Sequence, residues 1–447
     1  MIQAGVLLSL SLVLATTGLS APTDPGPVVQ EFAVCTNTAS QSAPVIDGGL
    51  VAWQDARNGN IDIYGYDLAS GAESALAAGP GDQRNPALYG GVLAWQERGQ
   101  VWGDIRVREL ASGYQLSISA SAELRLALGD NLVLWDGVDI RGLDLATSSP
   151  LLLTQDLYAQ SQPRVWGDVA VWTDWRNSDA DIYGYDLARG TEFPIVVAPG
   201  HQWNPAIGGN ILVWEDWRNG NADIYGYNLS TRVEFPISIA PGNQQLPAIS
   251  ANLVVWQDNR QGNPDVYGYD LTTGLSFAIA SGQLPEDRPV AWGNIVVWQD
   301  RRGGNLDIYG ARLLPAIQGR VLAQGRNSSQ GTHVSLDGYA LSIPPDGGFS
   351  FLALAQSSHS LDVSLPGYLG RRLDVPAEPG AVSLPDIVLK GGDVNGDGDI
   401  DTSDLALTAQ AVNTLSPRRG MPPDINGDGV VDILDLALIG LNLGATE

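Results

Sequence analysis

The sequence predicts a mainly β protein, with a seven-bladed β-propeller followed by a small β-sandwich and a small α-helical, calcium-binding module. Three observations carry this prediction. A tryptophan-headed segment recurs seven times over the first two thirds of the chain, alternating strand-like segments follow it, and two acidic 12-residue loops stand near the C-terminus. At about 100–200 residues per domain, a chain of 447 residues is expected to hold several domains.

The tryptophan-headed repeat is predicted to form the propeller over residues 28–314. Its best-kept copy, NILVWEDWRNGNADIYGYNL at 210–229, reads as a buried strand, a tight type I′ hairpin at Asn219-Gly220 and a returning strand. With a strand on either side, each copy holds four strands in ~40–45 residues, which is typical of a propeller blade. Copies two and three depart from the motif but keep the spacing. The framework tryptophans are Trp53, Trp95, Trp135, Trp172, Trp214, Trp256 and Trp298, which lie 37 to 42 residues apart.

The recurring pattern VW-x-D-x-RNGN-x-DIYGYDL resembles the TolB-type, WD40-like propeller family over residues 31–313. The segment that opens this region aligns with the outer strand of later blades, whereas the seventh copy ends without an outer strand. We therefore expect Glu31–Val34 to pair with Asp307–Leu313 and close the ring, which removes an open sheet edge. Cys35 is then expected to be buried.

An Asp–Arg–Asp trio recurs in five blades, beginning with Asp55, Arg57 and Asp62. One interpretation is a ring of catalytic or metal-binding carboxylates. The other is structural, with each arginine bridging two carboxylates across a hairpin. A catalytic site normally breaks the symmetry of a repeat, and the trio is present in every well-kept blade. We therefore favour the structural interpretation.

Two tryptophans break the repeat at equivalent positions of blades four and five. Trp175 and Trp217 stand where other blades have Ala56, Asn259 or Arg301. The scaffold therefore does not require an aromatic residue there. One interpretation is that Trp175 and Trp217 are exposed and form a ligand-binding platform on which sugar rings stack. The other interpretation, which the pattern favours, is local packing over a hairpin.

Alternating strands between Gly, Pro and Asp turns occupy residues 315–390. The segments GRVL, VSLDGY, DGGFSFLAL and HSLDVSLPGY resemble the carboxypeptidase-regulatory-like, prealbumin-like β-sandwich. The resemblance implies a rigid spacer or an accessory binding module. His333 and His359 lie in this region and are interpreted as packing or surface residues, not as a metal pair.

Two acidic loops near the C-terminus each have the ligand spacing of a calcium site. Oxygen donors fall at loop positions 1, 3, 5, 9 and 12, a backbone carbonyl falls at position 7, and Gly at position 6 makes the sharp turn. Hard oxygen donors without Cys or nearby His favour Ca²⁺ over transition metals, so two calcium ions are expected. The predicted ligands are Asp393, Asn395, Asp397, Asp399, Asp401 and Asp404, and then Asp424, Asn426, Asp428, Val430, Asp432 and Asp435.

Each acidic loop runs into a helix, no good helix precedes it, and Asp replaces Glu at position 12. These features resemble a type I dockerin over residues 391–447. The resemblance implies a cohesin-type module as partner, contacted through loop positions 10 and 11. These positions hold Thr402 and Ser403 in the first copy, and Ile433 and Leu434 in the second. Because the second pair is apolar where the first is hydroxylic, we do not expect two equivalent docking modes.

The N-terminal segment predicts a secreted protein, and the overall charge bears on its partners. Residues 1–20 read as a signal peptide, with an apolar run at 6–15 that is short for a membrane span. No later segment is apolar enough to cross a membrane. The net charge of −26 argues against a nucleic-acid partner. The single cysteine excludes a disulfide framework within the chain.

No catalytic motif is recognisable, and we assign no catalytic residue. The main hypothesis is a secreted, non-catalytic recognition protein. Its calcium-dependent dockerin would dock to a cohesin-bearing complex or cell surface, and its propeller would present a protein- or glycan-binding face. The alternative is a dockerin-borne polysaccharide hydrolase or lyase with its site at the propeller channel. A purely structural spacer is a third hypothesis.

Overall fold

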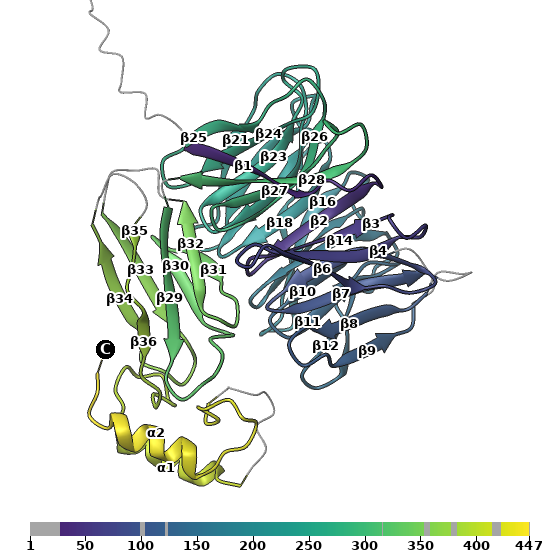
Figure 1. The fold of residues 1–447 in the computed structure, drawn as a ribbon. Helices are drawn as coiled ribbons and strands as arrows, with labels where there is room; N and C mark the ends of the chain where they lie inside the picture. Colours follow the sequence, from purple (N-terminus) through teal and green to yellow (C-terminus); the bar gives the residue numbers. More distant parts are fainter. Residues whose placement is uncertain are drawn as a thin grey trace, which may run out of the picture.

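The computed structural model describes residues 27–98, 103–120, 124–314, 316–352, 358–376, 382–413 and 422–446. Sheets arranged as a ring form its largest part. A sandwich of two sheets lies against one face of the ring, and two helices pack at the far end of the sandwich (Figure 1). The predicted mainly β fold is therefore confirmed. The predicted signal peptide lies outside the described residues.

Seven four-stranded antiparallel sheets form the blades of a propeller. In each blade the second strand is buried on both faces and carries the framework tryptophan, as Trp214 does. Blade by blade, the strands are β2 (Gln41–Asp47), β3 (Leu50–Asp55), β4 (Asp62–Asp67) and β5 (Ala72–Ala77); β6 (Asp82–Tyr89), β7 (Val92–Arg98), β8 (Ile105–Glu109) and β9 (Gln115–Ile118); β10 (Leu126–Gly129), β11 (Leu132–Trp135), β12 (Arg141–Asp144) and β13 (Ser149–Leu152); β14 (Gln160–Trp166), β15 (Val169–Asp174), β16 (Asp181–Asp186) and β17 (Thr191–Val196); β18 (Gln202–Gly208), β19 (Ile211–Asp216), β20 (Asp223–Asn228) and β21 (Val233–Ser238); β22 (Gln244–Ser250), β23 (Leu253–Asp258), β24 (Asp265–Asp270) and β25 (Leu275–Ala280); and β26 (Glu286–Trp292), β27 (Ile295–Asp300), β28 (Asp307–Leu314) and β1 (Val28–Cys35).

The N-terminal strand closes the ring, as the sequence predicts. Strand β1 pairs antiparallel with β28, with Glu31 opposite Ala311, and becomes the outer strand of blade seven. The side chain of Gln299 in blade seven accepts a hydrogen bond from the backbone N–H of Ala43 in blade one at 2.7 Å. Cys35 is buried, and this burial raises the pKa of its thiol to about 11.

The hairpin between the second and third strands differs from the predicted type I′ turn. In blade five the backbone N–H of Gly220 donates to the carbonyl of Trp217 at 3.2 Å, and Gly220 has a φ of +94°. Asn219 does not have a positive φ, which a type I′ turn would require at both central residues. The turn therefore starts one residue earlier than predicted, at Trp217. Its geometry brings Trp217 and Arg218 into the hairpin.

Two four-stranded sheets face each other in the sandwich and enclose a core that includes Phe351 and Leu361. The same core continues into the helical module through the buried side chains of Ile400, Ile425 and Ile439. One sheet contains β29 (Ala316–Ala323), β32 (Gly348–Leu352), β35 (Val382–Ser383) and β36 (Ile387–Leu389), and the other contains β30 (His333–Leu336), β31 (Tyr339–Ser342), β33 (His359–Ser364) and β34 (Arg371–Val375).

The sandwich sits on the propeller face that carries the turns between first and second strands; we call it the sandwich face. The Asn252 side chain donates to the carbonyl of Leu352 at 2.9 Å, and the Ser350 hydroxyl donates to Asn294 at 2.8 Å. Gly293 has a φ of +57°, and a Cβ there would lie 2.2 Å from the Ser350 carbonyl oxygen. Only glycine fits this close approach. The opposite propeller face, which we call the open face, carries the hairpins between second and third strands.

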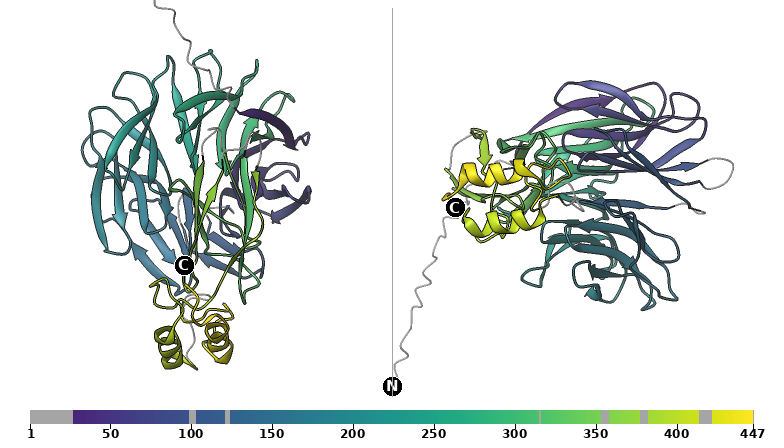
Figure 2. Two further views of the ribbon diagram at one scale, coloured as in Figure 1. Left: turned by 90° about the vertical axis from the view of Figure 1, so that its left-hand side faces the viewer. Right: turned by 90° about the horizontal axis from the view of Figure 1, so that it is seen from below.

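Helices α1 (Thr402–Ala411) and α2 (Ile433–Asn442) lie side by side at the end of the molecule (Figure 2). Each begins with a capping box, formed by Asp401 and Asp404 in α1. The two halves of the module exchange backbone hydrogen bonds. Ile400 N–H donates to the carbonyl of Ala445, and Asn413 N–H donates to that of Val431, both at 2.8 Å.

Candidate functional site

In five blades an arginine binds the aspartate that ends the second strand. In blade one, Arg57 donates to Asp55 from Nε at 2.9 Å and from Nη2 at 2.7 Å, and its guanidinium lies 4.0 Å from the centre of the Tyr64 ring. Trp53 Nε1 also donates to Asp55 at 2.9 Å. Although burial opposes it, hydrogen bonding from Arg57 and Trp53 holds the pKa of Asp55 below its usual value. These charges are satisfied within the scaffold.

The second aspartate of the trio is not bridged by the arginine, which corrects the sequence interpretation. Arg57 forms its other ion pair with Glu73 on the outer strand β5. Asp62 instead accepts hydrogen bonds from the side-chain amides of Asn58 and Asn60. Four of the five arginines thus tie their hairpins to the outer strand, which is a structural role. Equivalent outer pairs are Arg176–Glu192, Arg218–Glu234 and Arg302–Glu31.

An aromatic cluster of Trp175, His201, Trp203 and Trp217 lies on the open face at blades four and five. Trp203 lies between the two predicted tryptophans, with ring centres 6.2 Å from Trp175 and 6.1 Å from Trp217. His201 stacks on Trp203, with ring centres 5.5 Å apart and an interplanar angle of 12°. The structure therefore brings Trp175 and Trp217 into one cluster. Both are half-buried, and neither is fully exposed as the platform interpretation expects.

Glu215 anchors this aromatic cluster from beneath. It accepts hydrogen bonds from Trp203 Nε1 at 2.9 Å, from the Asn204 side chain at 2.6 Å and from the Leu246 N–H at 2.7 Å. Its burial raises its pKa, while the three donors act in the opposite direction. Four other blades have Gln54, Gln96, Gln257 and Gln299 at the equivalent position, and only blade three also has a carboxylate there, Asp136.

Sequence reasoning missed Trp203 and Glu215 and gave His201 no role. The signal was present, because Trp203 is aromatic where blades one, four and six have Ser42, Ser161 and Gln245. The backbone N–H of Ala180 donates to His201 Nδ1 at 3.1 Å, which places the ring proton on Nε2.

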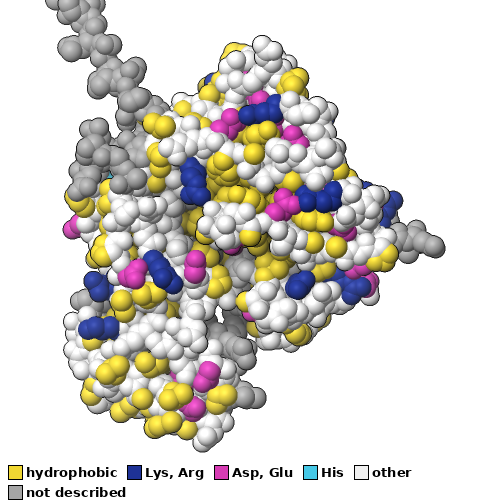
Figure 3. Space-filling view, viewed as in Figure 1, with side chains coloured by type: hydrophobic (Ala, Val, Ile, Leu, Met, Phe, Trp, Pro, Cys, Tyr) yellow, Lys and Arg dark blue, Asp and Glu magenta, His cyan; other side chains and the backbone are white. Residues whose placement is uncertain are grey.

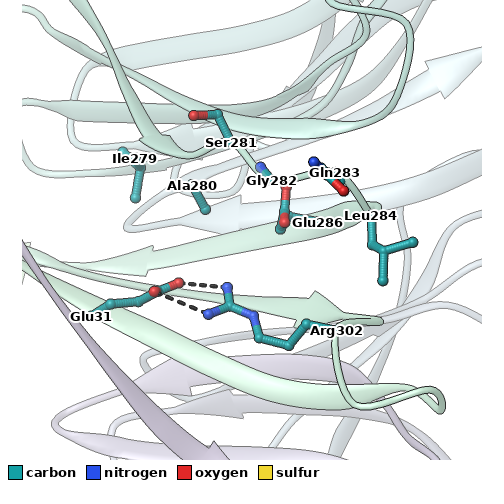
Figure 4. A pocket seen from close by; sticks show the side chains of 9 residues that line it. All are labelled: Glu31, Ile279, Ala280, Ser281, Gly282, Gln283, Leu284, Glu286 and Arg302. Carbon is teal, nitrogen blue, oxygen red and sulfur yellow. Dashed lines mark hydrogen bonds and ion pairs between the residues drawn. The ribbon is translucent and has the colours of Figure 1, made fainter.

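A cavity of about 430 Å³ lies beside blade seven (Figure 4). One wall is the two-hydrogen-bond ion pair between Arg302 and Glu31 of the ring-closing strand. Glu286 lines the cavity as well, with its Oε2 3.1 Å from the N–H of Gly282. Burial, followed by repulsion from Asp300 and other carboxylates, raises the pKa of Glu286 to about 7. Five other blades have a glutamine at the position of Glu286.

The two acidic loops have the conformation that a calcium loop requires. In the first loop, Asp393 accepts hydrogen bonds from the N–H groups of Gly396, Asp397 and Gly398, and Gly398 has a φ of +89°. Asp404 is fully buried and accepts the N–H groups of Val394, Asn395 and Asp401. The second loop repeats these bonds at Asp424 and Asp435.

The donor chemistry of the loops fits a hard cation. Burial and the neighbouring carboxylates of Asp404 and Asp397 raise the pKa of Asp393, and a cation would offset this repulsion. Nowhere in the described chain do three His, Cys, Asp or Glu side chains form a ready metal cluster. Bound calcium would therefore also need amide and peptide oxygens, such as those of Asn395 and Asp399.

The predicted partner-binding residues lie on the exposed surface of the two helices. Ile433 is 70% exposed and Leu434 is 56% exposed. Leu441, about two turns further along α2, is 71% exposed. Thr402 and Ser403 are exposed at the start of α1. Apolar side chains accordingly gather on the surface of the helical module (Figure 3). The two helices offer chemically different surfaces.

These calcium-type loops and their following helices decide the family of the module. Residues 391–443 match the dockerin type I domain. Dockerins of this type bind calcium, so calcium is the cation expected here. No curated protein matches the chain. The resemblance of the sandwich to the carboxypeptidase-regulatory family remains a prediction.

Two solved structures share the propeller fold. An oligogalacturonate lyase in complex with manganese is 14% identical, with a TM-score of 0.50, covering 65% of this chain and 95% of that one. The β-propeller domain of the Trilobed protease from Pyrococcus furiosus is 15% identical, with a TM-score of 0.50, covering 62% of this chain and 98% of that one. At this identity the likeness shows the fold alone.

Proposed function

We propose that this chain is a secreted, non-catalytic recognition protein that a dockerin attaches to a cohesin-bearing complex or cell surface. Its propeller holds a glycan or protein ligand on the open face. The observation that carries the proposal is the aromatic cluster, because it interrupts the repeat on the face opposite the sandwich. Dockerin-bearing proteins are typically extracellular. No helix within the described residues is long and apolar enough to cross a membrane.

The cluster of Trp175, Trp203 and Trp217 offers indole surface to the faces of sugar rings. The open face is not covered by the sandwich, and the rings are half-buried, so they keep accessible surface while their neighbours hold them in place. Glu215 and His201 restrict the movement of Trp203 from two sides. A pre-ordered aromatic surface loses little conformational entropy when a ligand binds.

The test is a glycan array probed with the full chain and with a Trp175→Ala/Trp217→Ala double variant. Loss of two stacking rings should weaken binding about tenfold or more. Asn259→Ala, at the equivalent hairpin position of blade six, is the matched control and should bind as the wild type does. Unchanged binding by the double variant would overturn the platform.

For the dockerin, we infer that each loop holds one Ca²⁺ through its six predicted ligands. The ion neutralises crowded carboxylates and orders the loop from which its helix begins. We further infer that α2 dominates cohesin docking, because Ile433, Leu434 and Leu441 expose a contiguous apolar surface that α1 lacks.

A pull-down with a cohesin panel, in calcium and then in chelator, tests docking. The Ile433→Asp/Leu434→Asp variant should abolish capture, whereas Thr402→Asp/Ser403→Asp should reduce it less. A stronger loss in the Thr402/Ser403 variant would reverse the assignment of the helices. Capture that persists in chelator would contradict the calcium requirement.

A further inference from the structure

The central channel of the propeller carries arginines at positions where the repeat uses neutral residues. The channel has a volume of about 630 Å³, and Arg125, Arg164 and Arg288 line it. Arg164 stands where the repeat places alanine or valine, as at Ala206 and Ala248. The chain as a whole has a net charge of −26. A channel lined by three arginines is therefore unusual in a protein with so large a negative charge.

These arginines lack the ion pairs that hold the hairpin arginines. No described acidic residue forms an ion pair with Arg125, Arg164 or Arg288, and the one hydrogen bond of the Arg164 guanidinium goes from Nη1 to the Pro163 carbonyl at 2.9 Å. Burial and then the charge of Arg125 lower the pKa of Arg164. Asp136 acts in the opposite direction but forms no ion pair with Arg125 or Arg164, so these two guanidinium groups face the channel without a paired counter-charge. A bound anion would supply it.

Only one acidic side chain lines the channel among the described residues, and it is weakly acidic. Burial raises the pKa of Asp47 to about 7, and its carboxyl group accepts the N–H of Gly90 at 2.7 Å. Asp47 lies at the end of its strand next to the sandwich face, whereas Arg125 and Arg288 lie at or near the open-face ends of their strands. The channel wall near the open face is therefore positively charged at neutral pH.

The sandwich lies against the other end of the channel. Leu341 of the sandwich contributes to the channel lining, and Pro344 lies against Gly48 at the rim. Tyr89, Trp166 and Trp292 line the channel on this deeper side. The result is a pocket with Arg125 and Arg288 nearer the open face and aromatic rings on the side of the sandwich. Its volume is within the range of ordinary ligand sites, about 300–1,000 Å³.

From this arrangement we propose that the channel binds an acidic sugar residue of a glycan, with its carboxylate at Arg125, Arg164 and Arg288 and its ring toward the aromatic side chains. Asn204 joins this channel to the aromatic cluster, because it lines the channel and follows Trp203 directly. A glycan chain lying on the cluster can therefore end in the channel. The inference deepens the glycan-binding role proposed above and rests on it.

Calorimetric titration of the full chain with trigalacturonate tests the proposal. The repeat itself indicates which replacements the scaffold tolerates: Arg164→Ala copies Ala206, and Arg288→Asn copies Asn204. Loss of one charged donor should weaken trigalacturonate binding about tenfold or more. Arg189→Gln removes the same charge from an exposed turn outside the channel and should have no effect. Thermal unfolding of each variant confirms that the propeller is intact.

Neutral galactotriose and the peptide triglutamate are the comparison ligands. Preference for trigalacturonate over both, lost in Arg164→Ala or Arg288→Asn, supports the proposal. Equal binding of galactotriose that is unaffected by the arginine variants overturns it but leaves the glycan-binding role standing. Binding of triglutamate alone overturns the choice of a sugar ligand. Binding of none of the three, together with an empty glycan array, overturns the channel and the glycan-binding role alike.

Discussion

Replacing Glu286 by Gln would give blade seven the residue that five other blades carry at this position. Glutamines there donate from Nε2 to a loop carbonyl, as Gln202 does to that of Gly200 at 2.9 Å. A carboxylate cannot make this bond, and Glu286 is only 2% exposed. We therefore expect Glu286→Gln to stabilise the propeller at neutral and alkaline pH.

The size and the pH window of this effect follow from the raised pKa. Burial raises the pKa of Glu286 from 4.5 to about 7. Between these values the native state binds more protons than the unfolded chain, so the free energy of unfolding falls as pH rises. At ~1.4 kcal/mol per pKa unit, the rise corresponds to at most about 3 kcal/mol. Because the carboxyl group lines a cavity that admits solvent, we expect about 1–3 kcal/mol.

Calorimetric unfolding of the full chain, at pH values from about 5 to about 8, measures the effect. The Tm of Glu286→Gln should exceed that of the wild type by a few degrees at the alkaline end and approach it at the acidic end. Gln244→Glu makes the reverse change at a fully buried position of blade six. It should lower the Tm most at high pH. A Tm difference that does not change with pH would refute the reasoning.

The other predictions concern the metal loops and the ring closure. Chelation of calcium should remove the helical circular dichroism of the dockerin and leave the β-sheet transition of the propeller in place, because the crowded carboxylates then repel one another. Asp404→Ala and Asp435→Ala should each weaken calcium binding in titrations of the full chain, and a variant with wild-type affinity would contradict the ligand assignment. Glu31→Gln should cost about 1 kcal/mol or less at this half-exposed pair and speed hydrogen exchange in β1. Glu234→Gln, which affects a pair inside one blade, is its control, and equal exchange of β1 in both variants would show that the Glu31 pair does not hold the closing strand.

The propeller was predictable because its blades repeat one local unit. Each framework tryptophan marks a strand buried on both faces, and the alignment of Glu31–Val34 with later outer strands indicated the missing partner of β28. The calcium loops were readable for a similar reason, since their ligands and glycines lie within 12 consecutive residues. The conformation of such short segments can be predicted because it depends on residues at fixed spacings within the segment.

Contacts between blades and between domains were not predictable in the same way. Asn252 and Leu352 are 100 residues apart in the chain, and no spacing rule relates them. The bond from the Leu246 N–H of blade six to Glu215 of blade five likewise depends on how neighbouring blades turn toward each other. The hairpin at Gly220 differed because the repeat's Arg–Asp pair selects a different turn from the one that Asn-Gly alone favours.

The shared core of the sandwich and the dockerin affects how the propeller reaches a ligand once the dockerin is bound to its cohesin partner. Arg326 and Tyr368 of the sandwich both donate to the Ile425 carbonyl, at 2.7 and 2.8 Å, and Asn442 donates to Gln324 at 2.6 Å. These hydrogen bonds and the shared core hold the dockerin in one orientation relative to the sandwich. Once the dockerin is bound, the open face of the propeller therefore keeps one orientation relative to the cohesin partner and samples only a small region of space around it. Any gain in effective concentration at a nearby glycan must then come from flexible segments of the partner, since a rigid mount contributes none.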